Sequence, residues 1–313
     1  MSTRRTFIKK SALGATALSF PGLYACGANT KNTMPKISLA QWSLNRAFFA
    51  KKLDPINFAS IAKNSYGISA VEYVNQFYTD NATDEKFWRE MAKRAADSEV
   101  KSLIMMVDEK EKLGDSNEDT RKAAIESHYK WVDAAKILGC HSIRVNAFGD
   151  GSLDELEVSL VDGLGKLTEY AAKEEVNVIL ENHGLHTSNA DFMTGIIKAV
   201  NNPYLGTLPD FGNWCLSAEW GSTQKTKNCN SVYPPEEGIA KFLPFAKGVS
   251  AKSYSFDTDG FDTAIDYPKL LQLVKDSDFN GHIGIEFEGE NMGEPEGIKA
   301  TKALIKKVWK GLN

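Results

Sequence analysis

The stretch VILENHG, residues 178–184, joins a predicted strand to a group of reactive side chains. Its apolar residues, together with Val176, are typical of a buried strand, because the run has no polar face. Three polar side chains, Glu181, Asn182 and His183, follow where that strand should end. A structural salt bridge would explain one of them, so the rest of the chain decides between a structural and a functional role.

Seven further short apolar runs follow the same pattern, and a longer amphipathic stretch follows most of them. The eight predicted strands are residues 37–43, 68–75, 101–108, 142–148, 176–183, 204–211, 248–256 and 282–289. Between them, apolar residues recur at three- and four-residue spacing, which predicts helices over 84–99, 118–139, 160–175 and 266–278. Strands that alternate with helices predict a parallel sheet. We therefore predict an α/β fold, a (β/α)8 TIM barrel that forms a single domain over residues 37–313.

The N-terminal segment is a separate unit. Arg4 and Arg5, followed by Phe7 and a short apolar run, are typical of a twin-arginine export signal. The sequence LYACG resembles a lipoprotein cleavage box in which Cys26 is the lipidated residue. We expect residues 1–26 to be a signal peptide and residues 27–36 a polar tether. The mature protein would then lie in the periplasm or on a membrane to which a lipid anchors it.

The charge balance argues against a nucleic-acid partner. The 313-residue chain has a formal net charge of −4. Residues 1–25 carry four basic and no acidic residues, so the mature chain keeps 33 basic against 41 acidic residues, a net charge of −8. An acidic chain of this kind does not favour a DNA- or RNA-binding surface.

Two features leave alternatives open. Cys215 and Cys229 flank a loop and could form a disulfide in an oxidising compartment, but their spacing does not decide this. The long insertion over residues 215–238 either shapes a pocket or forms a contact in a homo-oligomer.

Polar residues cluster at the carboxyl ends of the predicted strands, where (β/α)8 barrels have their active sites. They are Gln41, Trp42, Glu72, Tyr73, Asn75, Asp108, Arg144, Asn146, Glu181, Asn182, His183, Asp210, Asn213, Lys252, Tyr254, Glu286 and Glu288. The acids after the fifth, sixth and eighth strands should converge, and like charges repel unless a cation or a proton lies between them. Carboxylates beside an imidazole favour Mn²⁺, Mg²⁺ or Co²⁺, with Zn²⁺ as a further possibility.

Five stretches resemble the xylose-isomerase-like TIM barrel superfamily, the sugar phosphate isomerase/epimerase group that also contains endonuclease IV and other AP endonuclease 2-type barrels. They are residues 131–149, 178–184, 205–214, 249–257 and 281–289. The resemblance implies one divalent metal bound by acids at Glu181, Asp210 and Glu286. The sequence departs from the pattern at Ser250, where relatives often have a metal-binding histidine, and at Asn213, where they often have another. The five histidines are too few for the trinuclear zinc site of endonuclease IV.

The resemblance also implies a reaction, in which a proton is moved next to a carbonyl. Glu181 and Glu286 would transfer the proton, His183 would bind a substrate oxygen, and Arg144 and Lys252 would stabilise developing negative charge. Further substrate contacts are expected from Trp42, Glu72, Asn146, Asn213, Trp214 and Tyr254.

The expected export narrows the range of possible substrates. Phosphorylated sugars are scarce outside the inner membrane, so a metal-dependent isomerase or epimerase for a non-phosphorylated sugar is the first hypothesis. A 3-keto-glycoside lyase that works by β-elimination is the second hypothesis. A lipoprotein that binds carbohydrate without catalysis is the third.

Overall fold

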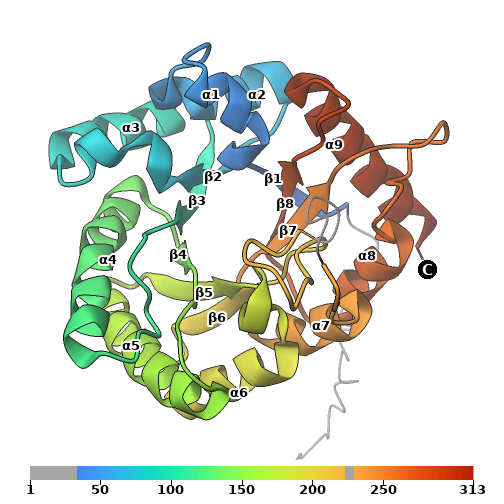
Figure 1. Cartoon of the computed structure of the whole chain (residues 1–313). Helices are drawn as coiled ribbons and strands as arrows, with labels where there is room; N and C mark the ends of the chain where they lie inside the picture. Colours follow the sequence, from blue (N-terminus) through green and yellow to red (C-terminus); the bar gives the residue numbers. More distant parts are fainter. Residues whose placement is uncertain (1–33, 223–228, 313) are drawn as a thin grey trace, which may run out of the picture. The chain divides into compact units, whose positions relative to one another are not determined.

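Eight parallel strands form a central ring, and helices surround it (Figure 1). The computed structural model describes residues 34–222 and 229–312. The strands are β1 (Lys36–Ala40), β2 (Ala70–Val74), β3 (Lys101–Val107), β4 (Ser142–Val145), β5 (Asn177–Glu181), β6 (Leu205–Leu208), β7 (Val249–Ser253) and β8 (His282–Phe287). They neighbour one another in the order β6-β5-β4-β3-β2-β1-β8-β7, and every pairing is parallel.

The first and last strands of this order, β6 and β7, close the barrel. Bridges join Thr207 to Ala246 and Asp210 to Ser250. The Ser250 N–H donates to the carbonyl of Pro209 at 2.9 Å, and the Ser250 carbonyl accepts from Phe211 N at 3.0 Å. The predicted single-domain (β/α)8 barrel is thereby confirmed.

The helices lie on the outside of the ring (Figure 1). They are α1 (Asn45–Phe49), α2 (Phe58–Tyr66), α3 (Glu85–Asp97), α4 (Glu118–Leu138), α5 (Leu153–Lys173), α6 (Ala190–Val200), α7 (Pro235–Phe242), α8 (Tyr267–Asp276) and α9 (Glu294–Gly311). Short 3-10 helices are η2 (Gln41–Leu44), η3 (Pro55–Asn57), η4 (Asn75–Phe77), η5 (Thr79–Asn81), η6 (Leu185–Ser188) and η7 (Leu243–Phe245).

The four predicted helices are present as α3, α4, α5 and α8. Helix α5 begins earlier than its apolar pattern indicated, at Leu153, because Ser152 and Glu155 form a reciprocal capping box. Helix α4 ends as expected at Gly139, whose φ of 78° is left-handed and strained for most side chains.

The predicted strands are present but end sooner than predicted. Strand β5 ends at Glu181 and β4 at Val145, so the polar residues after them lie in loops above the ring. This arrangement frees their side chains from the alternation of the sheet and aims them at the mouth of the barrel.

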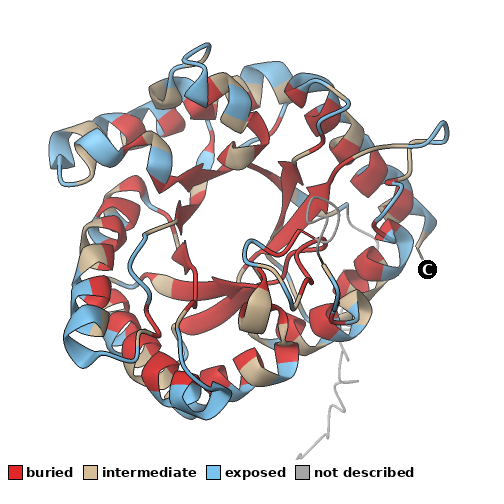
Figure 2. Cartoon of the chain, viewed as in Figure 1, coloured by how far each residue is buried: buried red, intermediate tan, exposed pale blue. Residues whose placement is uncertain are grey.

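Apolar side chains fill the layer between strands and helices, and Figure 2 shows buried residues on the strands and on the inner sides of the helices. A second, smaller cluster joins side chains of several strands. Its buried members are Ala40, Ala70, Val74, Leu103, Ile104, Met106, Ile179 and Leu208.

The predicted signal peptide, residues 1–26, and residues 27–33 of the predicted tether lie outside the described residues. Strand β1 begins at Lys36, one residue before the predicted start of the barrel. None of the helices in the described part of the chain is both long and apolar enough to cross a bilayer.

Candidate active site

Three buried carboxylates meet at the mouth of the barrel. Glu181 is the last residue of β5, Asp210 follows β6, and Glu286 lies near the end of β8. Their side chains offer ligand oxygens that all lie within 4.8 Å of one another, and each residue is at most 4% exposed. The structure thus brings together the three acids that the sequence placed on separate strands.

An ammonium group lies directly beside this acid triad (Glu181, Asp210 and Glu286). Lys252 Nζ on β7 is 2.9 Å from Glu286 Oε1, 3.3 Å from Glu288 Oε1 and 3.9 Å from Asp210 Oδ2. Burial alone would lower the pKa of Lys252, but Glu286, Glu288 and Asp210 raise it well above its usual value. These carboxylates therefore favour the ammonium form of Lys252.

A hydroxyl occupies the position where the resemblance implied a histidine. Ser250 Oγ lies 2.5 Å from Asp210 Oδ2 and 2.9 Å from Glu286 Oε2. The Ser250 hydroxyl can donate its one proton to only one of these carboxylates, so the other forms a hydrogen bond here only if it is protonated and donates to Ser250 Oγ. Burial raises the pKa of Asp210 to about 7, so a proton on Asp210 is accessible near neutral pH.

Arg144 on β4 pairs with two acids at once. Its guanidinium contacts Asp108, and its Nε lies 2.9 Å from Glu181 Oε2. The second contact is too bent for a hydrogen bond, so Glu181 Oε2 is a buried oxygen without a donor among the described residues. Burial raises the pKa of Glu181 well above its usual value, and Glu286 and Asp210 raise it further.

The donor set fits a hard divalent cation. The mouth holds five carboxylates, Asp108, Glu181, Asp210, Glu286 and Glu288, against two buried cations, Arg144 and Lys252. Ionised together they leave an excess of negative charge that needs protons or another cation. Glu181, Asp210 and Glu286 are positioned to hold such an ion through carboxylate oxygens.

A hydrogen-bonded chain fixes the orientation of His183. Asn146 Nδ2 donates to Asp108 Oδ1 at 2.8 Å, and Asn146 Oδ1 lies 2.8 Å from His183 Nδ1, which must then be the donor. Burial and the charge of Arg144 lower the pKa of His183 to about 3, so the imidazole is neutral. Its Nε2 is then a hydrogen-bond acceptor.

Asp108 remains ionised beside this chain. Burial alone would raise the pKa of Asp108, but Arg144, His183 and the Asn146 amide hold it at about 2.

Two other predicted substrate-binding residues also lie at the mouth. The half-buried Trp42 donates its indole N–H to Glu288 Oε1 at 2.6 Å. The Asn213 amide donates to Glu181 Oε1 at 3.2 Å, in the place where relatives often have histidine. Trp42 thereby contacts the partner of Lys252, and Asn213 contacts a member of the acid triad.

The prediction that Trp214 contacts the substrate requires a correction. Trp214 is fully buried against Tyr233 and Phe242, and its ring covers Gly238 of α7. It therefore packs between the sheet and a surrounding helix and offers no face to a substrate. Neighbouring Asn213 turns inward, and the side chain after it turns outward.

Glu72 also requires a correction. Its Oε1 accepts from Ser38 Oγ at 2.6 Å, and its carboxylate lies against Gly284. Gly284 precedes Glu286 by two positions and Ser38 precedes Gln41 by three, so Glu72 points down into the barrel instead of into the mouth. Burial raises its pKa to about 7.

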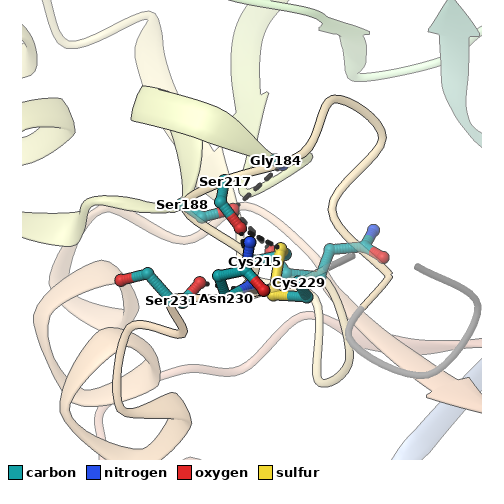
Figure 3. The surroundings of a disulfide bond; sticks show 8 residues. Gly184, Ser188, Cys215, Ser217, Cys229, Asn230 and Ser231 are labelled. Carbon is teal, nitrogen blue, oxygen red and sulfur yellow. Dashed lines mark hydrogen bonds between the residues drawn. A yellow bond between two sulfur atoms is a disulfide. The ribbon is translucent and has the colours of Figure 1, made fainter. Parts of the chain in front are cut away.

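The connection between β6 and α7 carries the disulfide that the sequence left open. Cys215 and Cys229 are bonded, with Cα atoms 5.8 Å apart (Figure 3). From this connection, Ser222 Oγ reaches the hydroxyl of the buried Tyr254 at 2.6 Å. Trp220 packs edge-on against His183, with ring centroids 5.0 Å apart. The insertion therefore helps to form the mouth of the barrel.

Three residues of the site had been given no role from sequence. Asp108 and Glu288 occur at strand ends, but nothing in the sequence showed that they would pair with Arg144 and Lys252. Trp220 lies in a loop outside any strand pattern, and the flanking cysteines were its only signal.

Comparison with known proteins supports this architecture. Among curated proteins no sequence match is found. The structure resembles 3-keto-D-glucoside 4-epimerase YcjR from E. coli, with 14% identity, a TM-score of 0.65, and coverage of 88% of this chain and 100% of that one.

Two further solved structures are similar. D-psicose 3-epimerase from Clostridium cellulolyticum H10 has 12% identity and a TM-score of 0.62, with 88% and 96% coverage. A xylose isomerase-like TIM barrel protein from Mycobacterium smegmatis in complex with magnesium has 13% identity and a TM-score of 0.61, with 90% and 98% coverage. At these identities the likeness shows the fold alone. The family model of xylose isomerase-like TIM barrels matches residues 61–308, and the chain belongs to that family.

Proposed function

We propose that the protein is an isomerase or epimerase that moves a proton next to a carbonyl group of a non-phosphorylated sugar or sugar derivative. The observation that carries the proposal is the meeting of two buried glutamates, Glu181 and Glu286, at one centre with Asp210. A carboxylate with a raised pKa is a stronger proton acceptor than an ordinary one, and burial raises the pKa of Glu181 well above its usual value.

The reaction needs a base, an acid and stabilisation of negative charge. One glutamate removes the proton from the carbon beside the carbonyl, and the electron pair moves onto the carbonyl oxygen to give an enediolate. The other glutamate returns a proton, either to the opposite face of the same carbon or to the neighbouring carbon. Lys252 beside Glu286 and Arg144 beside Glu181 face the negative charge that develops on the oxygens.

A divalent cation, when bound by Glu181, Asp210 and Glu286, would supply further positive charge for adjacent substrate oxygens. Mn²⁺, Mg²⁺ and Co²⁺ suit this oxygen-rich donor set. The neutral His183 orients the substrate by accepting a hydrogen bond from a substrate hydroxyl at Nε2, because its Nδ1 donates to Asn146 Oδ1.

The charges at the mouth and the proposed export favour a substrate without a phosphate group. The two cations buried at the mouth, Arg144 and Lys252, are outnumbered by the carboxylates around them, so the site does not favour the extra negative charge of a phosphate. The disulfide supports the proposed export, because such bonds persist outside the reducing cytoplasm. We further propose that the twin-arginine signal exports the protein and that a lipid on Cys26 anchors it to a membrane.

The test is proton exchange in D2O, followed by NMR with free ketoses and 3-keto-glucosides, in the presence of Mn²⁺ or of EDTA. Deuterium should appear beside the carbonyl of a rearranged sugar. Glu181→Gln and Glu286→Gln should each slow this exchange by about 10²- to 10⁴-fold. Glu157→Gln, an exposed change on α5, is the matched control and should leave the rate unaltered.

The other outcomes separate the alternatives. Release of the C1 substituent with formation of an unsaturated keto sugar would replace the proposal with the 3-keto-glycoside lyase. The protein would instead be a carbohydrate-binding protein without catalysis if the wild type showed no exchange and both glutamine variants bound sugar with the affinity of the wild type.

A further inference from the structure

A cavity of about 590 Å³ lies beside the acid triad, at the ends of β2, β3 and β4. This volume lies within the range of about 300–1,000 Å³ that is typical of small-molecule sites. Asp108 and Asn146 line the cavity, and both also contact residues of the site, Arg144 and His183. Arg144 thus links Asp108, which lines the cavity, to Glu181 of the acid triad, although the triad itself does not line the cavity.

Aromatic side chains line the cavity. Phe49 is one of them and packs edge-on against Trp42, with ring centroids 6.0 Å apart. Trp220 is another, and its ring centroid lies 5.5 Å from that of Phe148 and 5.0 Å from that of His183. Phe49 is 55% exposed and Trp220 is 49% exposed, and they are the only aromatic residues among the large exposed hydrophobic side chains of the described chain. Both rim this one cavity.

Polar groups form the remaining lining. Asn75 Oδ1 accepts from the Asp108 backbone N–H at 3.0 Å, and Gln76 Nε2 donates to Asp108 Oδ2 at 3.1 Å. The Asn75 amide N–H groups have no partner among the described residues, so they remain available to a ligand. The charged residues Glu109, Lys110, Glu111, Lys112 and Glu219 also line the cavity. Aromatic side chains together with amide and charged groups suit a sugar ring, which has apolar C–H faces and a polar rim of hydroxyls.

The wall formed by Trp220 is built into the fold. Gly184 and Glu219 form a bridge, and a Cβ on Gly184 would lie 2.3 Å from the Ala218 carbonyl oxygen. Trp220 itself has a φ of 62°, a left-handed conformation that is unfavourable for a bulky residue. The Cys215–Cys229 disulfide ties down Cys215, five residues before Trp220 (Figure 3). The aromatic side chain is thus preorganised at the cavity.

We propose that this cavity is a subsite for a second pyranose ring, so that the protein acts on a glycoside and not on a free monosaccharide. The reacting sugar would lie at the acid triad, and the ring attached to it would lie between Phe49 and Trp220. This assignment rests on the proposed function for the position of the reacting sugar.

The experiment is isothermal titration calorimetry on the full-length protein with saccharides as probes. Methyl β-glucoside is the one-ring probe, cellobiose and maltose are the two-ring probes, and the 3-keto forms of each are titrated in parallel. At least one disaccharide should bind about tenfold more tightly than the one-ring probe. Trp220→Ala and Phe49→Ala should each remove most of that advantage, because an aromatic contact is worth up to about tenfold in affinity.

Leu153→Ala is the matched control, because Leu153 is also 55% exposed but lies at the start of α5, away from the cavity. It should leave every affinity unchanged. Circular dichroism of each variant checks that the fold is intact.

Three results would overturn the subsite: equal affinity for one-ring and two-ring probes, an advantage that persists in both alanine variants, or no binding of any disaccharide. Phenyl β-glucoside binding as tightly as the best disaccharide would also overturn it, since a phenyl ring lacks the hydroxyls that Asn75 and Asp108 would recognise. The D2O exchange experiment is independent: loss of exchange with disaccharide preference retained rejects the proposed chemistry alone.

Discussion

Replacing Lys252 by methionine tests whether its ammonium neutralises the acids at the mouth. The change keeps the length of the side chain and removes the charge that lies 2.9 Å from Glu286 and 3.3 Å from Glu288. At an effective dielectric constant of about 20, each contact is worth roughly 5 kcal/mol before desolvation is subtracted. The variant can avoid part of this loss by taking up a proton on one of the carboxylates.

Proton uptake sets the size of the effect. Protonating one carboxyl with an ordinary pKa near 4.4 costs about 5 kcal/mol at pH 8 and about 2 kcal/mol at pH 6. The folded variant holds the extra proton more tightly than the unfolded chain, so its stability relative to the wild type should rise as the pH falls. We expect Lys252→Met to lower the free energy of unfolding by up to about 5 kcal/mol at pH 8 and by about 2 kcal/mol at pH 6.

Urea unfolding followed by circular dichroism in EDTA measures this difference. Lys275→Met is the matched control, because Lys275 is also buried but donates to the Leu312 carbonyl at 2.8 Å and not to a carboxylate. It should cost about 1–3 kcal/mol at both pH values. A Lys252→Met deficit that is below 1 kcal/mol, or that does not change with pH, would refute the reasoning.

Three further predictions concern Glu72, the disulfide and the acid triad. Burial raises the pKa of Glu72 to about 7, so its ionisation destabilises the fold as the pH rises from about 4.5 to 7. In urea unfolding, the free energy of unfolding of Glu72→Gln relative to wild type should rise by about 2.5 kcal/mol between pH 5 and pH 8, and a constant difference would contradict this. The disulfide spans a sequence separation of 14, so the free energy of unfolding of the Cys215→Ser, Cys229→Ser double variant should be about 3 kcal/mol below that of the wild type in oxidising buffer. A difference that persists after both the wild type and the variant are reduced would count against this prediction. Mn²⁺ at about 100 times its Kd should raise the free energy of unfolding by about 2.7 kcal/mol at pH 8, and by less at pH 5.5, where Asp210 holds a proton. If Mn²⁺ raised the Tm of Glu286→Gln as much as that of the wild type, the acid triad would not be the metal site.

The regular parts of the fold could be predicted because they depend on local pattern. Strands such as β5 and β8 appear as short apolar runs, and α4 appears as a three- and four-residue periodicity that ends at Gly139. The topology of a barrel then follows from the alternation, since parallel strands with intervening helices bring all carboxyl ends to one side. The convergence of the acid triad is a consequence of that rule.

The errors concern side-chain direction at places where the pattern stops. Glu72 was assigned to the mouth because it lies near a strand end, but Ser38 offers its carboxylate a partner deeper in the barrel. Trp214 lies beyond β6, where no alternation fixes a face, and Gly238 leaves room for its ring against α7. The role of Trp220 depends on a loop whose course is set by a disulfide and a left-handed residue, and neither can be read from periodicity.

The closure between β6 and β7 has a consequence for how the molecule opens. Isolated bridges hold this junction, in place of the continuous ladders that hold the other strand pairs. Asp210 stands on one side of it, and Ser250 and Lys252 stand on the other. The polar contacts of the site therefore also fasten the barrel at its weakest junction. Slow hydrogen exchange of the amides flanking this junction would report an occupied mouth, even when no substrate is turned over.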